Sequence, residues 1–297
     1  MADGSLVDAN ATHNSDLWFA MKAGQNNFGI TTHITTKAYP MGQVWGGLRV
    51  WNASQISAVA DAFAEYQRVG QLDTKSSVIA DLVPTNGTLF LTLIYFAPVT
   101  TRPAAFDAFY KIPAVADNSQ LHPNFLDLIS VGPPQVVPRF SYGFSNFYLD
   151  NSTTYRDVIN LIAKQGEKFK QVNGGTQVII PQPISKSMVD VALTTGGRPQ
   201  GLQSRAQLWM NMSWGWNLAS DDEYVYALIQ ETYNMVDALT KSRGLYDPYL
   251  FLNDAFPTQK VLRSYGEENF AKMQAVSKKY DPSRMFQDQV PGGFKLN

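Results

Sequence analysis

The feature that most restricts the fold is a pair of segments in which strands of period two alternate with amphipathic helices. In the first segment, residues 43–110, the predicted order is strand, helix, strand, strand, helix. Its strands are expected at 43–51, 76–83 and 88–97, and its helices begin at Ser54 and at Pro103. The dipeptide Asn86-Gly87, between the last two strands, is typical of a hairpin.

The second segment repeats part of this order between residues 155 and 239. A helix with one apolar face is followed by strands at 176–183 and 205–216. Residues 220–223 (SDDE) match a capping box that opens a second long helix. Two such segments predict an α+β fold, an antiparallel sheet covered by helices on one face.

Outside these segments the pattern predicts less. Residues 29–40 alternate as in a strand, and residues 249–256 are expected to form a strand that runs into a turn. A second capping box, at 264–267 (SYGE), precedes a helix near the C-terminus. Residues 111–150 and 185–203 carry no clear pattern, and loops as long as the second are often functional.

Composition excludes several classes of function. Lysine and arginine total 24 against 25 acidic residues, so the net charge of −1 gives no electrostatic footprint for nucleic acid or anionic lipid. The absence of cysteine excludes disulfides and thiolate chemistry, and the three widely separated histidines argue against a metal site. No apolar run is long enough to span a membrane. Five Asn-X-Ser/Thr sequons favour a parent protein that enters the secretory route; they lie at Asn10, Asn52, Asn86, Asn151 and Asn211.

The strand expected at 205–216 separates its side chains into two sets. Gln207, Trp209 and Asn211 alternate with one leucine and two methionines. Period two places the apolar set under the helices and the polar and aromatic set on the opposite face. From the residues alone, that opposite face is either a half-exposed sheet surface or part of a binding site.

Three stretches together resemble the C-terminal part of a berberine bridge enzyme-like oxidase. The opening "ADGSLVDANATHNSDLWFAMKAGQNNFGITT" is similar to the family's strand, its "DLWFAL(K/R)G" helix and its "G-G-NFGIVT" turn. The later "YLFLNDAF…SYGEENFAKMQAVSKKYDPSRMFQ" is similar to the family's ending, and "VPGGFKL" resembles a common fungal terminus. Members of this family are FAD-linked oxidases of the vanillyl-alcohol oxidase superfamily, and the chain looks like the fungal branch.

The resemblance implies a division of the chain into three parts. Residues 1–40 would be the last part of an FAD-binding domain, residues 41–248 the substrate-binding α+β domain, and residues 249–297 a segment that returns to the FAD-binding domain. The family's pyrophosphate-binding loop and flavin-tethering residues would precede this sequence. The resemblance therefore leads us to expect a truncated product or a separated C-terminal half.

The resemblance also implies roles for individual residues. The backbone around Asn27, Phe28, Gly29 and Ile30 would lie against the flavin, where glycine permits close approach. Asn253 would lie beside the flavin as well. The catalytic residue would be Asp254, which stands where many relatives carry a tyrosine proposed as catalytic base; this departure puts tyrosine-type base chemistry in doubt. An Asx turn explains Asp254 with fewer assumptions.

The substrate would bind the sheet face that carries Gln207, Trp209 and Asn211, with Tyr142 and Gln182 as further contacts. Trp209 is expected to face Asp254 and to desolvate its carboxyl group.

The function implied is oxidation of a small organic substrate, a secondary metabolite or a sugar-like molecule, by hydride transfer to FAD. Two alternatives stay open. One is a flavin-independent acid–base isomerase or cyclase, and the other is a non-catalytic fragment or a subunit that needs a separate FAD-domain partner. We expect this chain alone to bind FAD weakly or not at all, because the phosphates need backbone donors from a loop outside it. We also expect self-association through apolar surface at 1–40 and 249–297. Relatives in the family are often secreted.

Overall fold

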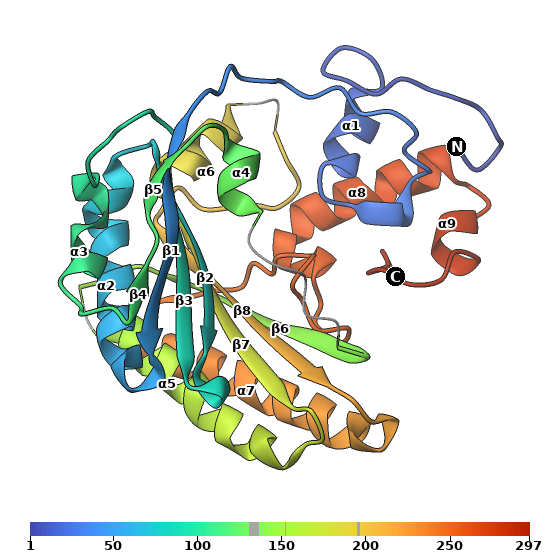
Figure 1. Cartoon of the computed structure of the whole chain (residues 1–297). Coiled ribbons are helices and arrows are strands. Elements are labelled where there is room, and N and C mark those ends of the chain that lie inside the picture. The colour runs from blue at the N-terminus through green and yellow to red at the C-terminus, as the bar shows by residue number, and fades with distance from the viewer. Residues whose placement is uncertain (131–136, 152, 195–196) are drawn as a thin grey trace. The chain divides into compact units, whose positions relative to one another are not determined.

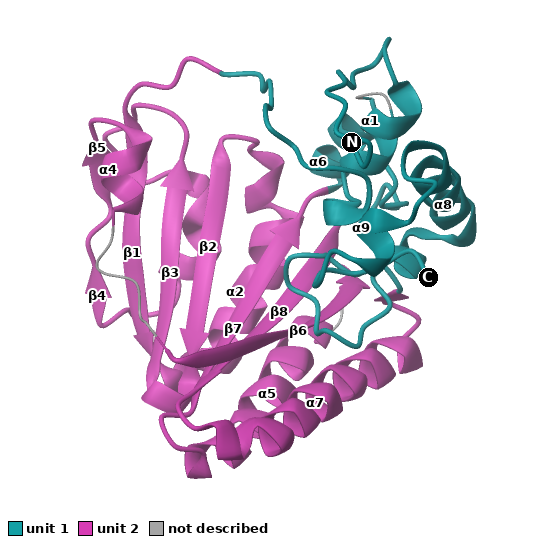
Figure 2. Ribbon diagram, turned by 90° about the vertical axis from the view of Figure 1, so that its right-hand side faces the viewer, with its two compact units in different colours: residues 1–38, 186–205, 248–297 teal, residues 39–185, 206–247 magenta. Residues whose placement is uncertain are grey.

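The computed structural model describes residues 1–130, 137–151, 153–194 and 197–297 (Figure 1). These residues form two compact units (Figure 2). Unit 1 contains Met1–Ala38, Lys186–Arg205 and Pro248–Asn297, and unit 2 contains Tyr39–Ser185 and Ala206–Asp247. These bounds differ from the predicted ones chiefly at Lys186–Arg205, which groups with the two ends of the chain. Whether those ends belong to an FAD-binding domain stays a prediction.

Unit 2 contains one large sheet. Its strands are β1 Val44–Asn52, β2 Ser76–Val83, β3 Thr88–Tyr95, β4 Ala116–Asp117, β5 Gln120–His122, β6 Arg139–Tyr148, β7 Thr176–Ile184, β8 Gln207–Trp216 and β9 Tyr246–Asp247. The order across the nine-stranded sheet is β4-β1-β3-β2-β7-β8-β6-β9, with β5 also paired to β1. All of these pairings are antiparallel. The predicted fold class is therefore confirmed.

The helices of unit 2 cover mainly one face of this sheet (Figure 2). They are α2 Ile56–Arg68, α3 Asp107–Tyr110, α4 Phe125–Ile129, α5 Thr154–Glu167 and α7 Asp222–Ser242. Aromatic side chains fill the space between β1 and residues 104–110, which comprise a 3-10 turn and α3: the ring of Trp51 lies 6.4 Å from that of Phe109, and the ring of Trp45 lies 5.9 Å from that of Phe106. Helix α4 is an exception, because its Leu128 packs with Val44 and Ile94 on the other face, at the β1 edge.

The regular elements described in unit 1 are helices, joined by long irregular segments. It contains α1 Ser15–Met21, α6 Lys186–Leu193, α8 Glu267–Tyr280 and α9 Met285–Asp288. Helix α1 is tied to the end of α8 through Asp16, which accepts a hydrogen bond from Tyr280 Oη at 2.9 Å and pairs with Lys279 Nζ at 2.7 Å. Within the described ranges no helix combines the length and apolar character needed to cross a bilayer. The same ranges hold no group of three or more His, Cys, Asp or Glu side chains placed to bind a metal.

Two predicted strands do not form. Residues 29–40 have no strand partner, and Ile30 and Ile34 are 79% and 77% exposed. Without a neighbouring strand, the alternating pattern gains no ladder of hydrogen bonds. Residues 249–256 are also not a strand, because Leu252-Asn253-Asp254 make a turn in which Asp254 N donates to Phe251 O at 3.1 Å.

Neither predicted capping box forms. At the start of α7 the side chain of Asp221 makes no capping bond, and Asp222 instead accepts from Arg139 Nε and from Trp216 Nε1. At the start of α8 the N-cap is Gly266, while Ser264 Oγ donates to Val261 O at 2.6 Å. Asp222, within the first box, and Ser264, which opens the second, therefore bond to tertiary or local partners in place of the helix N-terminus.

The two stretches without a clear pattern contain regular structure. Strand β6 lies in the first stretch, between β8 and β9, and α6 lies in the second. Strand β6 is buried on both faces over most of its length, so its sequence lacks the alternation that marks a half-exposed strand.

Candidate functional site

The two faces of the sheet in unit 2 differ in what covers them. A Cβ atom at Gly143 of β6 would meet Ile229 and Tyr233 of α7 and also Met212 of β8, so these side chains lie on the helix-covered face. The ring of Trp214 likewise lies 5.1 Å from that of Phe169, which follows α5. Side chains at the alternate positions therefore point to the opposite face. We call it the open face because helices α2, α5 and α7 do not cover it, although several of its side chains, such as those of Phe144 and Asn146, are buried.

The predicted polar set of β8 lies on this open face. In the antiparallel register Trp209 stands opposite Gln182 of β7 on one side and Asn146 of β6 on the other. Asn211 stands opposite Ile180 and Phe144 in the same way. Four of the five predicted substrate residues thus come from neighbouring positions of β7 and β8: Gln182, Gln207, Trp209 and Asn211. That they bind substrate stays a prediction.

Tyr142 lies on the open face too, further along β6. It stands opposite Ser213, and its ring makes an edge contact with Phe140 at 5.4 Å. In the register of β8, Ser213 lies four positions from Trp209. We use the term row for these polar and aromatic side chains of the open face: Tyr142, Asn146, Gln182, Gln207, Trp209 and Asn211. Tyr142 lies at one end of the row.

Gln207 joins the row through its side-chain carbonyl. Its Oε1 accepts one hydrogen bond from Asn146 Nδ2 at 2.9 Å and another from Trp209 Nε1 at 3.0 Å. The indole ring of Trp209 also meets the ring of Phe144 edge-on at 6.3 Å. These bonds fix the orientation of the indole and of both amides before any ligand arrives.

A buried glutamine of α2 holds the backbone beneath this row. Gln67 Nε2 donates to Gln207 O at 2.8 Å and to Ile184 O at 3.0 Å, while its Oε1 accepts from Tyr155 Oη of α5. Burial raises the pKa of Tyr155 well above its ordinary value, so the phenol stays protonated and donates. Two helices thereby position the ends of β7 and β8.

Two side-chain acceptors on the open face are buried without a partner among the described residues. They are Oδ1 of Asn146 and Oδ1 of Asn211. A buried acceptor without a donor costs about 1–3 kcal/mol. Both amides belong to the row around Trp209, and each could accept a hydrogen bond from a ligand.

Unit 1 contains the residues predicted to contact flavin, and two of them have structural roles. Asn27 is fully buried, and its Nδ2 donates to Gly24 O at 2.7 Å and to Phe294 O at 2.8 Å. Gln287 Nε2 of α9 in turn donates to Asn27 O at 3.0 Å. Phe28 is fully buried against Gly24, where a Cβ atom would lie 2.1 Å from its ring. The tight turn therefore joins α1 to the C-terminal tail.

The next two residues are accessible. A Cβ atom at Gly29 would meet only the side chain of Met1, at 3.4 Å or more, and Ile30 is exposed. The buried Oδ1 of Asn27 has no partner among the described residues. That Gly29 and Ile30 lie against a flavin stays a prediction.

Asn253 and Asp254 lie in the turn of unit 1 described above. Asn253 is exposed, whereas Asp254 is 8% exposed. The predicted proximity of Trp209 to Asp254 concerns residues of different units and stays a prediction, as does the catalytic role of Asp254.

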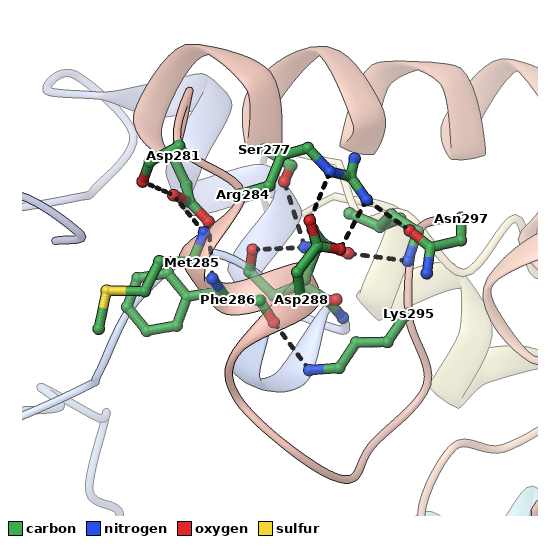
Figure 3. Close-up of polar contacts among 12 residues, drawn as sticks. Ser277, Asp281, Arg284, Met285, Phe286, Asp288, Lys295 and Asn297 are labelled. Atoms are coloured by element: carbon green, nitrogen blue, oxygen red, sulfur yellow. Dashed lines mark hydrogen bonds and ion pairs between the residues drawn. The ribbon is translucent and has the colours of Figure 1, made fainter.

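The "YDPSRMF" motif stabilises the C-terminal helix of unit 1 (Figure 3). The carboxylate of Asp281 accepts from Met285 N at 2.9 Å and from Phe286 N at 2.8 Å, which caps α9. Arg284 pairs with Asp288 through two contacts of 2.9 Å and also reaches Asn297. Lys295 donates to Phe286 O at 2.8 Å. The motif therefore holds α9 and the C-terminal tail in place, a role that the sequence did not predict.

Three residues of the open-face row and its support were missed from the sequence: Asn146, Gln67 and Tyr155. Asn146 lies in the stretch that showed no strand pattern. Gln67 and Tyr155 lie on helix faces that are otherwise apolar, and a lone polar residue on such a face is a signal that could have indicated a buried contact.

Comparison with known proteins shows related sequences and a shared fold. No family model matches the chain. It is 42% identical over 296 residues to the bifunctional solanapyrone synthase of Alternaria solani, covering 100% of the chain and 57% of that protein. It is 35% identical over 304 residues to an FAD-dependent monooxygenase of Arthrobotrys oligospora, covering 99% of the chain and 57% of that protein. The chain thus spans less than two thirds of the length of these curated relatives.

The structure is similar to that of a berberine bridge enzyme-like protein of Physcomitrella patens, with a TM-score of 0.76 at 17% identity. The match covers 99% of this chain and 63% of that one. The chain therefore has the fold of the corresponding part of a berberine bridge enzyme-like flavoprotein, and its sequence relatives include proteins named as FAD-dependent monooxygenases.

Proposed function

We propose that unit 2 is the substrate-binding part of an FAD-linked oxidoreductase and that its open face binds a small organic molecule. The observation that carries this proposal is the row of Gln182, Trp209 and Asn146. In it a fixed indole lies between two amides, and the buried Oδ1 of Asn146 has no partner among the residues that the structure describes. Apolar surface with a few oriented polar groups is typical of small-molecule sites. The related FAD-dependent proteins and the shared fold support the same conclusion.

The residues of this chain would act by binding and orienting. The indole of Trp209 would provide a flat apolar surface, while Gln207 fixes its orientation through the hydrogen bond at 3.0 Å. The acceptors of Asn146 and Asn211 would orient hydroxyl or amine donors of the substrate. FAD, when bound, supplies the hydride acceptor. Gly29 and Ile30 would contribute one wall against its ring.

Asp254 is the group to which we assign proton exchange with the substrate. Its carboxyl is 8% exposed, and a buried carboxyl near a substrate hydroxyl can accept a proton as hydride leaves. In the proposed oxidation of an alcohol carbon to a carbonyl, the carboxylate of Asp254 would take up the hydroxyl proton of the substrate.

The test combines this chain with FAD and a separately produced FAD-binding domain. We expect oxygen uptake with hydroxylated aromatic or sugar-like substrates only when both polypeptides are present. Asp254→Asn should lower that rate by about 10²–10⁴-fold, with Asp61→Asn, on α2, as the control for loss of one carboxylate. Turnover without flavin and without oxygen uptake would contradict oxidation and support the acid–base alternative. Binding of the partner without turnover would support the non-catalytic alternative.

A further inference from the structure

One carboxyl group lies isolated on the open face of unit 2. Asp81 lies in β2 between Ala80 and Leu82, which are buried on the helix-covered face, so its own side chain points to the open face. As a whole, the residue is exposed. Among the described residues, the carboxyl group of Asp81 has no hydrogen bond and no ion pair.

The neighbours of this carboxyl are apolar. Phe90 of β3 stands directly opposite it, and Ile79, two positions earlier in β2, is 46% exposed on the same face. The pairing of Leu82 with Ile179 places Ile180 of β7 beside Asp81 on its other side. These surroundings desolvate the carboxyl and raise its pKa.

Asp81 and Asn211 are connected by cross-strand neighbours on the open face. Ile180 stands opposite Asn211, so the connection runs from β2 through β7 to β8. With neighbouring strands 4.7–4.9 Å apart, Asp81 and Asn211 are separated by about 10 Å. The Asp81 end is exposed, whereas the Asn211 end is enclosed: Asn211 is 4% exposed, and its Oδ1 has no partner among the described residues.

We propose that Asp81, Ile180 and Asn211 form a recognition strip for an elongated ligand that carries a hydrogen-bond donor at each end of an apolar frame. The carboxylate of Asp81 and the Oδ1 of Asn211 accept from the two donors, and Ile180 supports the apolar frame between them. The donor at Asp81 is a hydroxyl or an ammonium group. This inference rests on the proposed function, because it specifies the substrate class of the same open face.

A structural role does not account for Asp81. A carboxylate with no partner on an apolar surface loses hydration and gains no compensating bond, so it lowers the stability of the folded state. Residues that bind ligands often reduce stability in this way. The two explanations predict opposite effects for removal of the charge.

The test measures binding to the chain in the absence of flavin. The probes share a biphenyl frame and differ in their donors: 4,4′-biphenol has two, 4-phenylphenol has one, 4-phenylbenzylamine carries an ammonium group, and biphenyl-4-carboxylate has no donor. Affinity is measured by ligand-observed and amide NMR titration. We expect biphenol to bind about 5- to 10-fold more tightly than phenylphenol, and the carboxylate not to bind.

Variants assign the two ends of the strip. Asp81→Leu should weaken the binding of biphenol by about 10- to 100-fold, and Asn211→Leu should abolish its advantage over phenylphenol. Asp81→Asn keeps an acceptor, so it should weaken the amine more than the phenols. Glu223→Gln, which removes one exposed carboxylate from α7, is the matched control and should leave binding unchanged.

Stability measurements separate binding from folding. Asp81→Asn should unfold at the same or a higher temperature than the wild type, whereas a structural carboxylate would make the variant less stable. Equal binding of biphenyl-4-carboxylate, binding that survives Asp81→Leu, or clear destabilisation by Asp81→Asn would each overturn the inference. Because no flavin is present, failure of this strip would leave the proposed oxidation to be judged by oxygen uptake.

Discussion

Replacing Gln67 by methionine should destabilise unit 2 more than any surface substitution on the same helical segment. Methionine has a similar length and volume but cannot donate or accept as an amide does. The change removes the bonds to Gln207 O and Ile184 O, at 2.8 and 3.0 Å, and the acceptor for Tyr155 Oη. Gln67 and Tyr155 are 4% and 2% exposed, so water does not readily replace these bonds.

The magnitude follows from the groups left without partners. A buried polar group that loses its partner costs about 1–3 kcal/mol, so the phenol and two carbonyls together give a loss of about 3–5 kcal/mol, since such costs are not fully additive. For a unit of this size, 1 kcal/mol shifts the melting temperature by about 2–4 °C, which gives a decrease of about 6–20 °C. Thermal and urea unfolding followed by circular dichroism would measure both quantities.

A double-mutant cycle sharpens this test. Tyr155→Phe alone leaves Gln67 Oε1 without its donor, whereas Gln67→Met combined with Tyr155→Phe removes both partners, so the double variant should lose less than the sum of the single losses. Gln55→Met is the control, because Gln55 makes one exposed bond to Pro113 O at 3.1 Å. A loss below about 1 kcal/mol for Gln67→Met, or strict additivity in the cycle, would refute the argument.

Three further predictions concern other parts of the chain. The pKa of Asp81 is raised in the folded state above the unfolded value of 3.8. The free energy of unfolding of the wild type, relative to that of Asp81→Asn, should therefore fall as the pH rises from 3.8 through the folded-state pKa. Urea midpoints measured between acid and neutral pH check this. Arg49→Met should lower the free energy of unfolding by about 2–3 kcal/mol. Asp117, whose Oδ2 lies 2.5 Å from Arg49 Nη1 and whose side chain is 26% exposed, would then lack its charged partner. An unchanged urea midpoint would contradict this. In a secretory host, the exposed Asn52 and Asn86 should carry glycan and Asn211, buried in β8, should not; peptide mapping that finds Asn211 fully occupied would overturn its placement.

The sequence by itself determined the elements whose patterns are local. The strands β1, β2, β3, β7 and β8 and the helices α2, α5 and α7 follow the predicted ranges closely, because the pattern of each segment has the period of its own backbone. The same alternation placed Gln207, Trp209 and Asn211 on one face, away from the helices. The antiparallel α+β class followed from the order of these elements.

Only the tertiary structure decided the features that depend on partners far along the chain. Residues 29–40 have a strand pattern but no strand beside them, whereas β6 lacks the pattern and becomes an inner strand between β8 and β9. The box predicted at 220–223 does not cap α7, and Ser264 of the other box donates to Val261 O. Asn146, Gln67 and Asp81 gain their significance from residues on other strands and helices, and sequence spacing carries no information about which strands will be neighbours.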